Sequence, residues 1–112
     1  MIAHVVLYEM RADLDPAERE RLEHTVRATL QSIPSVCRWL IGHRTSLGVS
    51  YEELMQPSYE YAAVVEFADA AGLRDYLEHP LHGELARLFW SCSARTLVFD
   101  YEVMETQTRT TA

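Results

Sequence analysis

The sequence contains no lysine, and all ten of its basic residues are arginines. A Schiff-base nucleophile and the lysine of a phosphate-binding loop are therefore excluded. Glycine is scarce as well, and the patterns Gly-x-Gly-x-x-Gly, Gly-x-Ser-x-Gly and Cys-x-x-Cys do not occur. The sequence thus gives no local support for a dinucleotide site, a hydrolase nucleophile or a zinc ribbon.

Long apolar runs and an excess of positive charge are also missing. No segment approaches the ~20 apolar residues that cross a bilayer, and no basic and then apolar leader is present. The net charge of −7 argues against nucleic acid and anionic membranes as partners. We therefore expect a cytoplasmic protein whose cysteines, Cys37 and Cys92, are buried and reduced.

What the sequence does contain is typical of one globular domain, because 48% of its 112 residues are apolar. We assign residues 1–104 to this domain and residues 105–112 to a flexible polar tail. Hydrophobic periodicity predicts strands at 2–10, 36–47, 59–67 and 95–103, and helices after Asp15, after Asp69 and after Pro80. This order is the ferredoxin-like βαββαβ arrangement, an α+β fold with a four-stranded antiparallel sheet.

In such a fold the helices cover only one face of the sheet. The other face must here carry much of the apolar residue set of the strands, and an exposed patch of that size is unusual in a monomer. Two chains that pack sheet against sheet would cover both patches. We therefore expect a homodimer through the sheet face, in the form of a dimeric α+β barrel.

The segment from Tyr76 to His82 holds the main functional candidates. Pro80 lacks an amide N–H and favours an extended His79, so one helix should end just before it and another should begin at Pro80. His82 then lies in a first helical turn, where unpaired amides and the helix dipole disfavour its protonation. A neutral imidazole can accept a proton, so we predict His82 as general base and Tyr76 as the group that hydrogen-bonds the enolate or aldol oxygen.

Four segments together resemble the stress-responsive A/B-barrel (Dabb) family. They are the opening Met-Ile-x-His-Val-Val-Leu, Val64-Val65-Glu66-Phe67, Tyr76-Leu77-Glu78-His79-Pro80-Leu81-His82 and Leu97-Val98-Phe99-Asp100-Tyr101. The matches follow family order over about residues 2–103. The resemblance implies a dimeric α+β barrel and, through polyketide cyclases of the olivetolic acid cyclase type, cofactor-free cyclisation.

Within that resemblance, His82 and Tyr76 fall on the catalytic residues of the cyclases, and His4 falls on a first-strand histidine near their pocket. The substrate-shaping residues differ, so olivetolic acid chemistry itself is not expected. The departures from the cyclases are at Glu23, Val26, Tyr61 and Ser93. We predict substrate contacts at His4, Tyr61, Ala63 and Leu85.

The leading hypothesis is a cofactor-independent enzyme without a metal, which performs an aldol- or Claisen-type cyclisation, or a related proton transfer, on a β-keto compound. A first alternative is a stress-responsive dimeric barrel that binds a small apolar ligand without turnover, in which His82 caps a helix. A second alternative is a cofactor-free monooxygenase or a haem-handling protein of similar fold.

For the remaining polar residues we expect structural roles. His79 should form hydrogen bonds at the helix break, and His4 should be a core histidine unless it faces the proposed base across a cavity. Asp100 could orient a histidine, but pairing with an arginine is favoured. His24 and His43 are expected at the surface.

Overall fold

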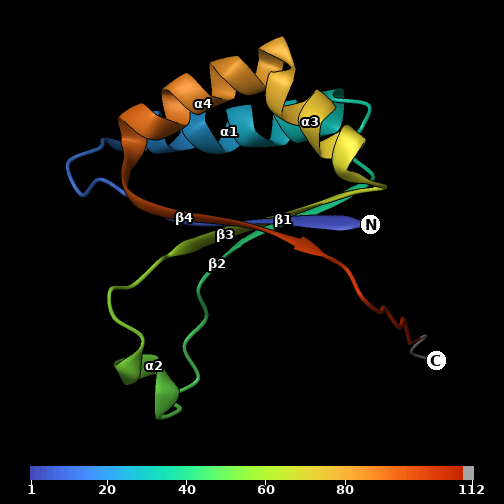
Figure 1. The fold of residues 1–112 in the computed structure, drawn as a ribbon. Coiled ribbons are helices and arrows are strands. Elements are labelled where there is room, and N and C mark those ends of the chain that lie inside the picture. The colour runs from blue at the N-terminus through green and yellow to red at the C-terminus, as the bar shows by residue number, and fades with distance from the viewer. Residues whose placement is uncertain (110–112) are drawn as a thin grey trace.

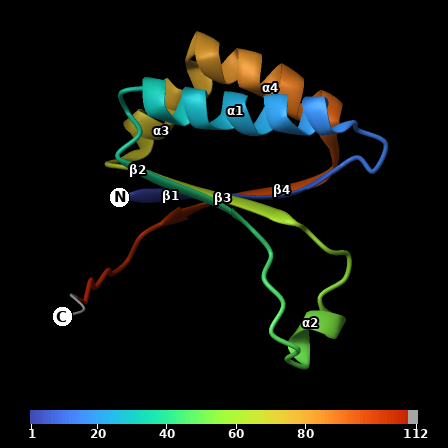
Figure 2. The same ribbon diagram turned by 180° about the vertical axis from the view of Figure 1, so that it is seen from behind.

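The computed structural model describes residues 1–109 as a layer of helices on one face of a sheet (Figures 1 and 2). The elements are β1 (Ile2–Met10), α1 (Pro16–Ser32), β2 (Arg38–His43), α2 (Tyr51–Leu54), β3 (Tyr61–Phe67), α3 (Ala70–Glu78), α4 (Pro80–Cys92) and β4 (Ser93–Glu102). The four strands are antiparallel in the order β2-β3-β1-β4. The predicted α+β ferredoxin-like fold is therefore confirmed.

Helices α1 and α3 begin where their capping residues predict. The Asp15 side chain accepts a hydrogen bond of 2.9 Å from the Glu18 amide at the start of α1, and Asp69 accepts one of 2.9 Å from the Gly72 amide at the start of α3. Such caps satisfy amides that have no partner within the helix. The buried stripe of α1 then packs towards the sheet, and it consists of Leu22, Val26, Thr29 and Leu30.

The second strand is shorter than predicted, and the third begins two residues later. The register of β2 and β3 ends at His43 and Tyr61, and one further backbone hydrogen bond of 2.6 Å, from the Arg44 amide to the Glu60 carbonyl, closes the base of an extension that we call the arm (residues 44–60). The arm, which includes α2, projects away from the helical layer (Figures 1 and 2). Inside it, the Arg44 guanidinium donates to Ser58 Oγ at 2.8 Å and to the Glu52 carbonyl at 3.0 Å.

The two faces of the sheet have different surroundings. Side chains on the helix face form the core together with the helices, and Val65 and Phe67 are among its most buried members. The opposite face, which we call the outer face, is not covered by helices (Figure 1). Its large exposed apolar residues are Leu40, Leu97, Phe99 and Tyr101, with 37 to 55% of their surface accessible.

Other expectations have mixed outcomes. Cys92 is buried and both cysteines are free, but the prediction that Cys37 is buried was wrong, because it precedes the edge strand β2 and is exposed. His24 and His43 are exposed, as predicted. Of the predicted tail, residues 105–109 have no regular structure, and residues 110–112 lie outside the described part. Within residues 1–109, no helix is long and apolar enough to span a bilayer.

Candidate functional site

The site begins at the break between α3 and α4. His79 is extended (φ −67°, ψ 138°), and its Nδ1 accepts a hydrogen bond of 3.1 Å from the Leu81 amide. His79 is therefore the N-cap of α4, which confirms its predicted structural role. The capping role that was considered for His82 is thus performed by His79. Pro80 is the first residue of α4, so His82 lies in the first turn, as predicted.

A cavity of about 250 Å³ lies between the helices and the sheet, next to this turn. Five of the six predicted site residues line it, and they come from β1, β3, α3 and α4: His4, Ala63, Tyr76, His82 and Leu85. Tyr61 is not among the lining residues, and its ring instead stacks on Tyr8 with centroids 5.2 Å apart.

Several cavity residues escaped the sequence reasoning, notably Tyr8, Leu77, Trp90 and Val98. Tyr8 could have been found, because it shares a face of the first strand with His4. Trp90 and Val98 are both more than two-fifths exposed, and no sequence pattern indicates that exposed apolar residues border a cavity.

Three rings form a contiguous group in the cavity wall. Tyr76 lies edge-on to His82 with ring centroids 4.6 Å apart, and edge-on to His4 at 5.8 Å. The phenol therefore stands between two imidazoles that come from opposite layers of the fold. His4 and His82 thus face one cavity, the arrangement that favours a functional role for His4 over a purely structural one.

The protonation states follow from this environment. Burial lowers the pKa of His82 below its ordinary value of 6.5, and the nearby His4 lowers it further. Burial raises the pKa of Tyr76 to about 12. At neutral pH the site therefore offers a neutral base and a neutral hydrogen-bond donor. The direction for His82 is the expected one, although its main cause is burial and not the helix terminus.

The lowered pKa of His82 can be measured directly. Of the five histidines, His82 should give ring C–H signals in ¹H NMR that titrate with a midpoint below 6.5, and these signals should be missing in His82→Asn. Because the unfolded chain takes up this proton first, stability contributed by neutral His82 is complete above pH 6.5 and falls as the pH drops through the folded pKa. A midpoint at or above 6.5 would contradict the burial of this ring.

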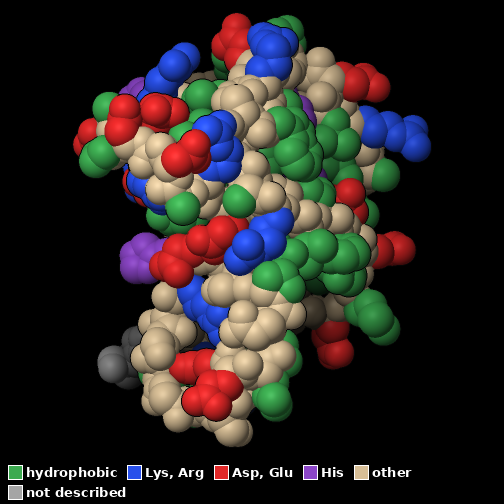
Figure 3. Space-filling model, turned by 90° about the vertical axis from the view of Figure 1, so that its left-hand side faces the viewer, with side chains coloured by type: hydrophobic (Ala, Val, Ile, Leu, Met, Phe, Trp, Pro, Cys, Tyr) green, Lys and Arg blue, Asp and Glu red, His purple; other side chains and the backbone are tan. Residues whose placement is uncertain are grey.

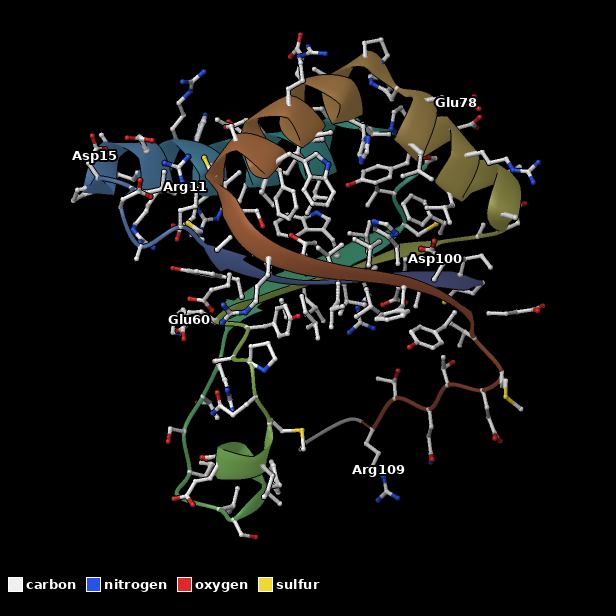
Figure 4. All side chains as sticks on the ribbon, turned by 60° about the vertical axis from the view of Figure 1, so that its left-hand side comes forward. Arg11, Asp15, Glu60, Glu78, Asp100 and Arg109 are labelled. Carbon is white, nitrogen blue, oxygen red and sulfur yellow. The ribbon has the colours of Figure 1, made fainter. Side chains whose placement is uncertain are left out.

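His4 is held by a carboxylate. Its Nδ1 lies 2.6 Å from Asp100 Oδ1, and Asp100 lies on the helix side of β4 (Figure 4). The prediction that Asp100 pairs with an arginine was wrong, because the register of β1 and β4 places it directly opposite His4. Since this contact uses Nδ1, the other ring nitrogen of His4 remains available to the cavity.

Loss of the contact between His4 and Asp100 should lower the stability of the protein moderately. We expect Asp100→Asn to lower the free energy of unfolding by about 1 kcal/mol, because a charge-assisted hydrogen bond to a buried ring is replaced by a neutral one. The partly exposed Asp100 side chain keeps the effect small. Chemical denaturation measures it, and exposed Asp75, which forms no such contact, provides a matched Asp→Asn control. Equal stability of wild type and Asp100→Asn would show that the contact contributes nothing.

Metal ligands do not converge at this site. Among residues 1–109, no group of three or more His, Cys, Asp and Glu side chains could hold a metal ion. The polar groups that do line the cavity are the imidazoles of His4 and His82, the phenols of Tyr8 and Tyr76, and the indole of Trp90.

Solved structures with the same fold carry different activities. A hydroxynitrile lyase from Passiflora edulis superimposes with a TM-score of 0.78 at 16% identity, covering 96% of each chain. SnoaB from Streptomyces nogalater, a cofactor-independent oxygenase, gives 0.72 at 16% identity and covers 96% of this chain and 97% of its own. A dimeric ferredoxin-like protein of unknown function from Thermobifida fusca gives 0.73 at 20% identity, covering 91 and 90%.

The sequence itself decides the family. A search of curated protein sequences finds no match. The model of the family described as Stress responsive A/B Barrel Domain, however, matches residues 2–103, which is nearly all of the described structure. The chain therefore belongs to the stress-responsive A/B-barrel (Dabb) family.

Proposed function

We propose that this protein is a cofactor-independent enzyme in which His82 and Tyr76 form an acid–base pair acting on a β-keto compound. The reaction would be an aldol- or Claisen-type cyclisation or a related proton transfer. The observation that carries the proposal is the edge-on contact of a neutral imidazole with an un-ionised phenol in the wall of an apolar cavity. Such C–H protons are acidic enough for a positioned imidazole to remove.

The steps balance without any further reagent. His82 takes the proton from the carbon between two carbonyls, and the electron pair of that C–H bond moves onto a carbonyl oxygen as an enolate. Tyr76 donates a hydrogen bond to this oxygen, which a low-dielectric cavity makes stronger than in water. The enolate carbon then attacks a second carbonyl. In an aldol reaction protonated His82 returns its proton to the new alkoxide; in a Claisen-type reaction the alkoxide collapses to a carbonyl, its bond to the alcohol or thiol leaving group breaks, and His82 protonates the leaving group.

The fold alone does not choose this reaction. The structural relatives with named activities include a hydroxynitrile lyase and a cofactor-independent oxygenase, so one architecture accommodates different reactions. Proton transfer to and from carbon is instead supported by the side chains of His82 and Tyr76. The substrate contacts proposed for His4, Ala63 and Leu85 are supported by their position in the cavity wall.

The binding alternative is favoured by the apolar character of the cavity, which would hold a small ligand without any reaction. The oxygenase alternative shares the cavity and the absence of a cofactor. Haem handling fits less well, because a volume of about 250 Å³ is small for a porphyrin. A Soret band after addition of haemin would support the haem-handling alternative.

We further propose that two chains pair through their outer faces. The exposed apolar side chains of this face need a cover, and several relatives of the same fold are described as dimeric. The arm borders the same face and carries the exposed apolar residues Leu47, Tyr51, Leu54 and Met55. The second sheet would pack about 10 Å away, alongside the arm.

The proposed proton transfer can be tested without knowing the natural substrate. Ethyl 2-oxocyclohexanecarboxylate is a neutral β-keto ester with one acidic proton between its carbonyls. The protein should speed exchange of this proton for deuterium in D₂O, followed by ¹H NMR, beyond the rate given by free imidazole at equal concentration. Exchange no faster than with imidazole would contradict the enzyme proposal and leave the binding alternative.

A further inference from the structure

We infer that the cavity selects an uncharged, ring-sized ligand that enters past Trp90 at the β4 edge, and that it excludes carboxylates and phosphates. This inference deepens the proposed function by naming its substrate class as neutral carbonyl compounds. Selection by charge concerns binding alone, so it can be tested separately from catalysis.

The side chains that line the cavity do not favour a charged ligand. The described residues that line the cavity include no Asp, Glu or Arg, and their polar groups belong to His4, Tyr8, Tyr76, His82 and Trp90. A charged group moved from water into such a wall loses its hydration, and an anion finds no arginine among these lining residues. His82 does not supply one, because burial and His4 both oppose its protonation.

A carboxylate behind the cavity wall also opposes an anionic ligand. The Asp100 carboxylate lies 2.6 Å from His4, on the side of that ring away from its free nitrogen. This fixed negative charge opposes an anionic ligand beside His4. The net charge of −7 acts in the same direction at long range.

The opening of the cavity is lined by apolar side chains. Three lining residues are substantially exposed, namely Leu77 (42%), Trp90 (62%) and Val98 (44%). They come from α3, α4 and β4, so the opening lies between these helices and the edge strand. Figure 3 shows hydrophobic side chains gathered on the side of the molecule where α4 and β4 lie. An apolar rim offers no counter-charge to an approaching anion.

The volume of the cavity limits the size of the ligand. A dry apolar cavity of about 150 Å³ binds benzene, and pockets for drug-sized ligands extend from about 300 to 1,000 Å³. The volume of about 250 Å³ lies between these values. It therefore suits one ring with a short substituent and not an extended chain.

The test compares two probes that share one ring and differ in charge and by one methyl group, methyl 4-acetylbenzoate and 4-acetylbenzoate; the methyl group alone accounts for about fourfold in affinity. Trp90 gives the readout, because its indole N–H signal in a ¹⁵N–¹H spectrum reports on the cavity rim and is assigned from Trp90→Phe. We expect the neutral ester to shift this signal saturably at pH 7.5 and to bind about tenfold or more tightly than the carboxylate. Equal affinities, or no shift with the ester, would overturn the inference.

A substitution at the rim should reduce the preference for the neutral probe. Val98→Arg places a guanidinium at the opening, so it should shift the ratio of carboxylate to ester affinity about tenfold towards the carboxylate. Ala94→Arg adds the same charge to the same exposed strand but outside the cavity wall, and should change neither affinity. If both variants tighten carboxylate binding equally, the preference comes from net charge and not from the wall, and the inference fails.

The outcome is independent of turnover. If the ester binds selectively but the protein does not accelerate α-proton exchange, the proposed catalysis fails and the charge selection stands. If exchange is accelerated but both probes bind equally, catalysis stands and the charge selection fails.

Discussion

His82→Ala should slow α-proton exchange of ethyl 2-oxocyclohexanecarboxylate by about a hundredfold or more, which is the usual contribution of a positioned general base. Tyr76→Phe should slow it by about ten- to a hundredfold, because the ring stays in place while the hydrogen bond to the enolate oxygen is lost. Both rates are measured by ¹H NMR in D₂O under identical conditions.

The controls separate catalysis from folding. His24→Ala removes an exposed imidazole of α1 and should leave the rate unchanged. His82→Asn keeps a polar side chain of similar size without a base, so it covers the case in which the alanine variant folds poorly. Melting temperatures of all variants are compared by circular dichroism. Folded His82→Asn with wild-type exchange would rule out His82 as the base.

Phe99→Asp should convert the proposed dimer into monomers. Phe99 lies on the outer face, directly opposite Val5 in the pairing of β4 with β1, and is 49% exposed in the single chain. The substitution removes apolar contact area and buries a carboxylate, and a twofold interface carries each change twice. We expect the dissociation constant to rise about a thousandfold or more, measured by analytical ultracentrifugation.

The matched control is Trp90→Asp. It also replaces an exposed aromatic residue with an acid, but on α4, in the helical layer and away from the outer face. This variant should sediment as the wild type does. A wild-type protein that is already monomeric at micromolar concentration, or a Phe99→Asp variant that remains dimeric, would disprove association through the outer face.

Local chemistry made most of the fold predictable. Asp15 and Asp69 cap helices because each lies just before a helical segment and accepts from an amide three residues later. Pro80 made the break between α3 and α4 predictable in the same way. The end of β2 was not predictable, because the residues after His43 keep a β-compatible composition although the strand has lost its partner there.

The site was predictable only in part, for a related reason. His82 and Tyr76 lie in one short segment, so their proximity follows from the helix break between them. The contact of His4 with Asp100 joins residues 96 positions apart and depends on the register of two strands. Sequence alone left two roles open for Asp100, and the less favoured one proved correct.

Strand β1 is central in the sheet and contributes side chains both to the cavity and to the outer face. His4 and Val5 are consecutive residues of this strand, and the alternation of side chains directs one to the cavity and the other to the outer face. In the proposed dimer, the backbone of this one strand would therefore separate the cavity from the second subunit. If a ligand in the cavity strengthens dimerisation, then by reciprocity dimerisation strengthens its binding by the same factor, and monomeric variants should bind it more weakly although no ligand contact is altered.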